Sequence, residues 1–255
     1  MKHSFKKQLT LVTFFSLSTI TAVYADVEDT VEKSFDVSQQ AVLRLANLNG
    51  GVDIEGWDKN EIKITAIITA DDQEDRDRIK IQFHQSSNDV SVETEYEKQL
   101  PWGRNDSSGR VDYKVMVPFG ASLAEIDLVN GLLVIDKVKG EIKANTVNGA
   151  INVQGLADDV ELNSVNGSIK ATYHQIDNID DIDLTTVNGS IKLYLPSELS
   201  ATINAETMHG SIKTAFGLSS NKKVFSGRSL SGSVGRGDIN INLESVNGSI
   251  KVMKN

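Results

Sequence analysis

The chain contains no cysteine, only three prolines, and few aromatic residues, which make up 6% of its 255 residues. Without cysteine it can form no disulfide, no thiolate metal site and no cysteine nucleophile. Its four histidines show no metal-binding spacing, and no Gly-x-Ser-x-Gly nucleophile elbow occurs. We therefore predict no catalytic residue, no cofactor and no metal site.

The chain also lacks an excess of positive charge. Its formal net charge is −9 and its pI is near 5.0. Nucleic-acid-binding domains present strongly basic surfaces, so we expect no nucleic-acid partner. Apolar residues make up 39% of the chain and charged residues 24%, which is typical of a folded soluble protein rather than a disordered one.

The first 25 residues have the pattern of a secretory signal peptide. Lys2, Lys6 and Lys7 precede an apolar stretch over residues 9–23, and Ala25 marks the expected cleavage site. The apolar stretch is shorter than the ~20 residues that span a bilayer. Removing 25 residues that contain three lysines and no acid leaves 230 residues with a net charge of −12. We expect an exported product, periplasmic or secreted, that is not embedded in the membrane.

A short motif recurs through the second half of the chain: a hydrophobic residue, Asn, Gly, one further residue, then usually a hydrophobic residue and Lys. Six copies place their second residue at Asn130, Asn148, Asn166, Asn188, His209 and Asn247, with spacings of 18, 18, 22, 21 and 38 residues. A weaker copy at residues 230–234 divides the last gap, and residues 48–50 form an isolated earlier copy. Repetition at this period indicates a repeat architecture.

Each repeat contains two short runs that alternate apolar and polar residues, which is the signature of a β-strand. Residues 160–164 form one such run and residues 168–171 the other. The alternation changes phase between Ser164 and Val165, which indicates a corner. Asn and Gly suit a corner because both tolerate positive φ.

Two architectures fit this pattern. An antiparallel meander would use Asn-Gly as a hairpin turn, whereas a β-solenoid would place it at the corner of each coil. Strict identity of the repeated residues favours the solenoid, because parallel strands stack like residues ~4.8 Å apart. We predict an all-β fold, mainly a β-solenoid of 18–22-residue repeats. An amide ladder of Asn130, Asn148, Asn166, Asn188, His209 and Asn247 should run along it, beside a hydroxyl column of Thr146, Ser164, Thr186, Thr207 and Ser245 and an isoleucine column.

Residues 26–117 are also rich in predicted strands but lack the tight repeat. We expect them to form the start of the same β structure or its cap, with a separate β-sandwich as the alternative. The predicted organisation is therefore a signal peptide over residues 1–25, a β-rich first part over 26–117, and the repeat solenoid over 118–255.

Four lysines lie four residues after the repeated Asn position: Lys170, Lys192, Lys213 and Lys251. If the repeats stack, these side chains form a basic stripe on an otherwise acidic body. Such a stripe would bind an anionic polymer such as an envelope glycan. The alternative is a solvated strand face that opposes aggregation.

Two carboxylates suggest a different function. Glu161 and Asp183 share one repeat position, and paired carboxylates hydrolyse glycosidic bonds. The equivalent residues of other repeats are Lys143, Asn204 and Asn242, so the pair also follows from repetition alone.

The stretch from Asn49 to Asp58 (NGGVDIEGWD), followed by residues 61–64 (EIKI), resembles the opening of the bacterial "putative adhesin" β-strand-repeat family, a domain of unknown function. The Val117-Pro118 step and the Val-Asn-Gly-Ser-Ile-Lys repeats are similar to the rest of that pattern. The resemblance implies an exported, solenoid-like bacterial protein. It brings no catalytic or binding residues.

We therefore expect a non-enzymatic protein of the bacterial envelope, with an adhesive, binding or structural role. Its partner would be an envelope glycan or another protein. A polysaccharide-cleaving enzyme and a self-assembling envelope component are the alternatives.

Overall fold

The computed structural model describes residues 26–97, 109–176, 179–222 and 227–255. The expected signal peptide, residues 1–25, lies outside the described residues. Strands dominate the described part, which has one short helix, α1 (Gln73–Arg78). Asp72 caps this helix by accepting a hydrogen bond from the backbone N–H of Asp75 at 2.8 Å. The all-β fold class is confirmed.

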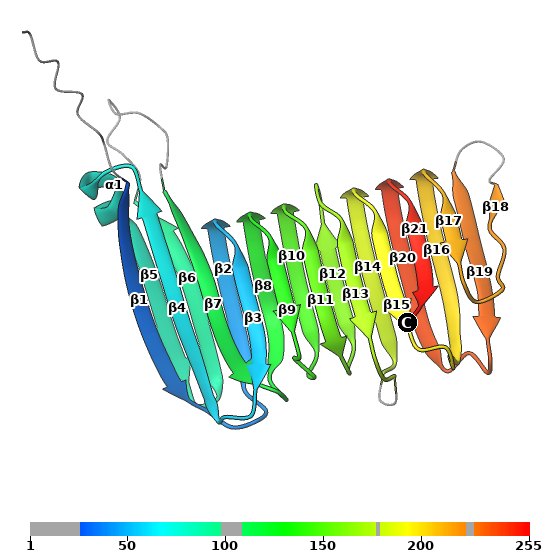
Figure 1. Ribbon diagram of the computed structural model, residues 1–255, viewed down its shortest axis with the longest axis horizontal. Helices are drawn as coiled ribbons and strands as arrows, with labels where there is room; N and C mark the ends of the chain where they lie inside the picture. The colour runs from blue at the N-terminus through cyan, green and yellow to red at the C-terminus, as the bar shows by residue number, and fades with distance from the viewer. Residues whose placement is uncertain (1–25, 98–108, 177–178, 223–226) are drawn as a thin grey trace, which may run out of the picture.

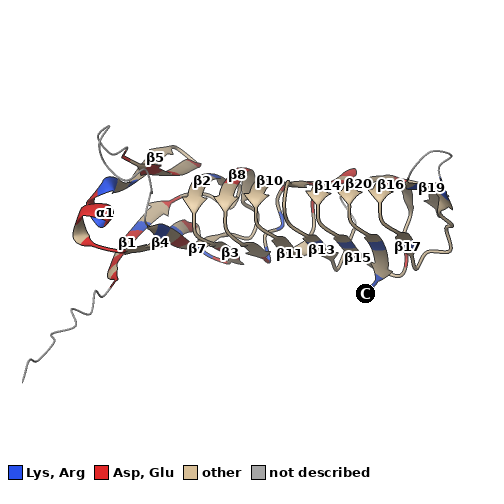
Figure 2. Cartoon of the chain, turned by 90° about the horizontal axis from the view of Figure 1, so that it is seen from above, with Lys and Arg blue, Asp and Glu red and all other residues tan. Residues whose placement is uncertain are grey.

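The strands form two sheets that lie face to face (Figures 1 and 2). Sheet 1 has, in spatial order, β1 (Val27–Asp36), β4 (Glu61–Ala70), β7 (Arg110–Pro118), β3 (Val52–Trp57), β9 (Leu133–Asp136), β11 (Ile151–Leu156), β13 (Ile169–Tyr173), β15 (Ile191–Leu195), β21 (Ile250–Lys254) and β17 (Ile212–Thr214). Sheet 2 has β18 (Asn221–Lys222), β19 (Arg228–Val234), β16 (Ala201–His209), β20 (Ile239–Asn247), β14 (Asp181–Asn188), β12 (Val160–Ser164), β10 (Ile142–Asn148), β8 (Ser122–Asn130), β2 (Val42–Asn49), β6 (Asp89–Tyr96) and β5 (Ile79–Ser86).

Neighbouring strands are parallel from β7 to β17 in sheet 1 and from β16 to β6 in sheet 2. The antiparallel pairs among the described strands lie toward the ends of the sheets. Each repeat places one strand in sheet 2, turns at its Asn-Gly corner, and places the next strand in sheet 1. An antiparallel meander is therefore wrong for these strands, and the arrangement is consistent with stacked coils. A coil here means one sheet-2 strand, its Asn-Gly corner and the sheet-1 strand that follows it.

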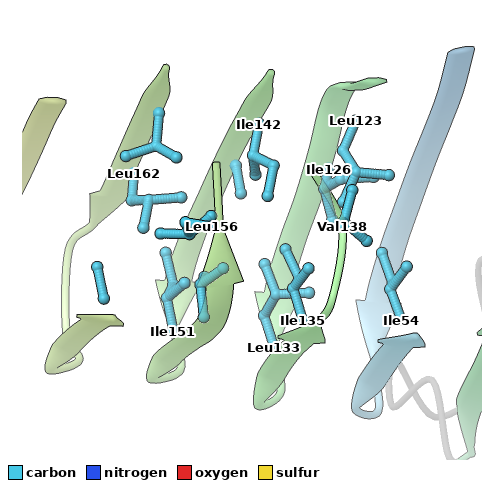
Figure 3. Packing of buried hydrophobic residues seen from close by; sticks show 14 of the residues in the cluster. Ile54, Leu123, Ile126, Leu133, Ile135, Val138, Ile142, Ile151, Leu156 and Leu162 are labelled. Atoms are coloured by element: carbon cyan, nitrogen blue, oxygen red, sulfur yellow. The ribbon is translucent and has the colours of Figure 1, made fainter. Parts of the chain in front are cut away.

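The core lies between the sheets, because alternate residues of every repeat strand point inward. Figure 3 shows Leu133 and Ile135 of sheet 1 pointing toward Leu123 and Ile126 of sheet 2. The expected isoleucine column is present, and its members Ile151, Ile169, Ile191, Ile250 and Ile212 are 0–6% exposed. Full burial of one such side chain contributes about 1.5–3 kcal/mol.

The sheets continue across the expected boundary at residue 117. In sheet 1, β3 lies between β7 and β9, and in sheet 2 β2 pairs with β8. The isolated early copy of the motif stacks on the later ones, because Asn49 pairs with Asn130. Strands from both sides of residue 117 share both sheets and one core.

The end of sheet 2 that is formed by β18, β19 and β16 corrects the repeat assignment. Residues 230–234, expected to form a weak repeat copy, belong to β19, which runs antiparallel to β16. Gly232 faces Ile203 within this pair, so it is a strand residue and not a corner. The last coil, β20 followed by β21, instead lies between the coil β14–β15 and the coil β16–β17 (Figure 1). The coil β16–β17 is then the terminal one, and the antiparallel strand β19 covers the sheet-2 edge of its strand β16.

Candidate binding face

Glycine is required at the stacked corner by close contact rather than by positive φ. A Cβ on Gly149 would lie 1.7 Å from the carbonyl oxygen of Gly131, and a Cβ on Gly167 would lie 1.8 Å from that of Gly149. Of the repeated corner glycines, Gly50 alone has a positive φ. The sequence-based explanation was therefore wrong, because the limiting factor is the backbone of the next coil.

The hydroxyl column points inward beside these glycines. Its five members are 1–5% exposed. Ser164, Thr186 and Ser245 donate to the glycine carbonyl of the coil stacked beside them, at 2.8–3.1 Å. Thr207 does the same with Gly248, at 2.8 Å. These bonds satisfy backbone carbonyls that the corner would otherwise leave without partners.

The asparagine ladder lies on the outside of the same corner. Each amide nitrogen Nδ2 donates to the Oδ1 of the asparagine in the previous coil at 2.8–2.9 Å, through Asn49, Asn130, Asn148, Asn166, Asn188 and Asn247. His209 follows Asn247 in register at the end of this series. The amide ladder thus runs from Asn49 to Asn247 along one outer edge, and His209 continues it in register only.

The four lysines occupy consecutive strands of sheet 1. Lys170 pairs in register with Lys192, Lys192 with Lys251, and Lys251 with Lys213. The spatial order differs from the order along the chain, because β21 lies between β15 and β17. We call these four residues the lysine column. The Nζ atom of Lys170 also lies 5.6 Å from the ring centroid of Tyr194.

Carboxylates are absent from the strands that carry the lysine column. The described strands β13, β15, β21 and β17 contain five lysines, Lys254 included, and no Asp or Glu. Within the described residues, no member of the lysine column takes part in an ion pair. Some lysines elsewhere do pair with carboxylates, namely Lys63, Lys137 and Lys143. The Nζ of Lys143 lies 2.9 Å from the Oε1 of Glu141, and this hydrogen bond raises the pKa of Lys143.

Sheet 2 carries the opposite charge in the same coils. Its strands β12, β14, β20 and β16 contain five carboxylates and no Lys or Arg. Figure 2 shows the coils edge-on, with Lys and Arg blue and Asp and Glu red on the two layers. These four coils therefore have a basic face in sheet 1 and an acidic face in sheet 2.

Glu161 and Asp183 are register neighbours on this acidic face. The amide Nδ2 of Asn163 donates to Glu161 at 3.3 Å, and that of Asn242 donates to Asp183 at 2.8 Å. Both carboxylates thus belong to the polar network of the strand face.

Sequence reasoning missed a further outward column. The hydrophobic residue before each repeated Asn points to solvent, and Val147, Val165 and Val187 are 41%, 42% and 38% exposed. Shallow grooves of about 450 Å³ and about 430 Å³ run beside this column near its two ends. The phase change between Ser164 and Val165 was the available signal, because it turns the hydroxyl inward and the valine outward.

The described residues contain no group of three His, Asp or Glu side chains that could hold a metal ion. In the same part of the chain, no helix is long and apolar enough to cross a membrane.

The Toastrack DUF4097 family model matches residues 32–253. The chain belongs to this family. The resemblance to a repeat family of unknown function is thereby confirmed, and the match includes the first part as well as the Val-Asn-Gly repeats of this Toastrack chain. No curated protein matches the chain significantly.

Solved structures similar to this Toastrack chain include a "putative cell adhesion protein" from Clostridium sporogenes, at 16% identity and a TM-score of 0.46, covering 89% of this chain and 100% of that one. A "putative adhesin" from Bacteroides fragilis is 11% identical with a TM-score of 0.42, and the match covers 88% of this chain and 97% of that one. A "putative lipid binding protein" from Parabacteroides distasonis is 12% identical with a TM-score of 0.29, and the match covers 88% of this chain and 96% of that one. Likeness at these values assigns no function to this chain.

Proposed function

We propose that the chain is an exported, non-enzymatic binding protein of the bacterial envelope, and that it binds a linear anionic polymer such as an envelope glycan. The lysine column carries the proposal. Its four ammonium groups repeat at ~4.8 Å and extend over about 14 Å. Because none has a carboxylate partner in the described part of the chain, their charge is available to a ligand.

The opposite charges of the two faces support a single docking orientation. A polyanion is attracted to sheet 1 of the C-terminal coils and repelled by the carboxylates of sheet 2. We further propose that the coils form a β-solenoid of 18–22-residue repeats. Such a fold presents the same side chain at every coil, so a repeating ligand meets repeating contacts.

Reversing the charge at the centre of the column tests this function. The variant Lys192→Glu/Lys251→Glu of residues 26–255 should lose retention on beads that carry polygalacturonic acid, a linear chain of carboxylated sugars. The unsubstituted chain should be retained at low salt and released at 1 M NaCl, where the Debye length is ~3 Å. Beads that carry neutral dextran should retain neither.

A matched control has the same net charge. Lys114→Glu/Lys143→Glu changes two exposed lysines outside the column and should leave retention almost unchanged. Equal retention of the two double variants, with circular dichroism showing that both are folded, would refute the proposed function.

A further inference from the structure

The C-terminal coil is out of chain order. From β8 to β15, each coil stacks on the coil that precedes it in the sequence, whereas β20 and β21 lie between β14–β15 and β16–β17 (Figure 1). The last coil therefore fills a slot between two coils that occur earlier in the chain. We call the space between these two coils the slot.

Both sides of the slot present the same columns in the same register. In sheet 2, Ser245 pairs with Thr186 on one side and with Thr207 on the other. In sheet 1, Ile250 likewise pairs with Ile191 and Ile212. The slot thus recognises the repeat motif, which any copy of residues 239–254 supplies equally well.

The two sides of the slot are also complementary to each other. Asn188 and His209 both pair with Asn247, so β14–β15 and β16–β17 could stack directly with the hydroxyl, isoleucine and lysine columns preserved. A coil displaced in this way would expose side chains that are now fully buried, among them Ile241 and Val252. The hydrophobic effect then favours its insertion into another slot of the same kind.

A short, glycine-containing connection joins the coil to the rest of the chain. Residues 235–238 link β19 to β20, and Gly235 and Gly237 have φ values of +64° and +81°. Arg236 and Asp238 between and after them form an exposed ion pair at 2.9 Å. Glycine also adopts extended backbone readily, so this connection can open without steric cost to its side chains.

We propose that the slot accepts the C-terminal coil of a second copy of this chain, so that two copies exchange residues 239–254 reciprocally. Each slot keeps all of its ladder bonds and buried columns in the exchanged dimer, and the changed part is the connection over residues 235–238. Exchange of an identical element is a low-cost route to a dimer. This proposal is independent of ligand binding at the lysine column.

Introduced cysteines can detect the exchange through a disulfide between two chains, because the chain itself contains no cysteine that could form a competing disulfide. Asp183 and Asn242 are register partners on β14 and β20, and adjacent strands ~4.8 Å apart satisfy the geometry of a disulfide. Chains with Asp183→Cys are mixed with size-tagged chains with Asn242→Cys, unfolded together, refolded at high concentration and oxidised. The mixed disulfide dimer should form on a non-reducing gel.

The control pair is Glu161→Cys with size-tagged Asn242→Cys. Glu161 lies one strand further from β20, on β12, so the two sulfurs are too far apart in an exchanged dimer. We expect roughly tenfold more mixed dimer from the adjacent pair than from the control pair. The doubly substituted chain Asp183→Cys/Asn242→Cys should form its own disulfide at low concentration. A mixed dimer no more abundant than the control would overturn the proposal.

Discussion

At each stacked corner, one set of repeated side chains contacts the next coil and another faces solvent. Gly167 packs against the carbonyl of Gly149, and Thr186 donates to the carbonyl of Gly167. Val165 and Asn166 of the same corner point outward. The inner positions repeat because the backbone of the neighbouring coil permits few alternatives.

The outer positions are not constrained in this way. Asn166 gains an amide bond from its neighbours, but an exposed valine and an unpaired lysine gain little within the coil. The lysine column even places like charges on adjacent strands, which costs tenths of a kcal/mol per pair. Repetition of an inner residue is therefore explained by folding, whereas repetition of an outer residue calls for another explanation.

The largest expected effect is at the inner glycine. Gly167→Ala places a Cβ 1.8 Å from the carbonyl oxygen of Gly149, so the backbone of one coil must move. We expect a loss of about 4 kcal/mol in the free energy of unfolding, beyond the 1–3 kcal/mol usual for overpacking. Urea denaturation followed by circular dichroism measures it.

Gly217→Ala is the matched control. No atom lies within 4 Å of a Cβ at this position, and its φ of +78° limits the cost to about 1 kcal/mol of backbone strain. Similar losses for Gly167→Ala and Gly217→Ala would mean that coil contact is not what requires glycine at the corner.

A smaller effect is expected at the inner hydroxyl. Thr186→Val keeps the shape of the side chain but removes its 2.8 Å hydrogen bond to the carbonyl of Gly167. We expect a loss of about 2 kcal/mol, because a buried acceptor loses its partner. Thr186→Ser keeps the hydroxyl found at Ser164 and loses one methyl group, about 0.8 kcal/mol. Thermal unfolding of the two variants should rank serine above valine, and the reverse order would contradict this role.

The hydroxyl, asparagine and isoleucine columns were predictable from the sequence, because each consists of similar or identical residues at one position of the repeat. The alternation of Val160–Ser164 and the phase change at Val165 set which residues point inward, and the Asn spacing set the stacking register. Close glycine contact was not predictable, since a corner glycine fits positive φ equally well.

The order of the last coils could not be predicted for a related reason. The hydroxyl and isoleucine columns of β20–β21 continue on both β14–β15 and β16–β17, so these columns give no preference between the two neighbours. Gly232 resembled a corner only because its flanking residues are similar to the motif. The four lysines of the lysine column were identified from the sequence. Their spatial order was not, because it depends on the position of β21 between β15 and β17.

The smallest expected effect is at the outer lysine. Lys192→Gln removes one of four adjacent like charges and breaks no ion pair within the described residues. We expect the free energy of unfolding to stay constant or rise by a few tenths of a kcal/mol, whereas retention on polygalacturonic acid should fall. Lys143→Gln should show the opposite pattern, because Lys143 is paired with Glu141 and lies outside the column. Chemical denaturation and bead retention, measured on the same preparations, separate the two roles. A loss of stability in Lys192→Gln comparable to that in Thr186→Val would assign the lysine column to folding, and the distinction between inner and outer columns would then fail.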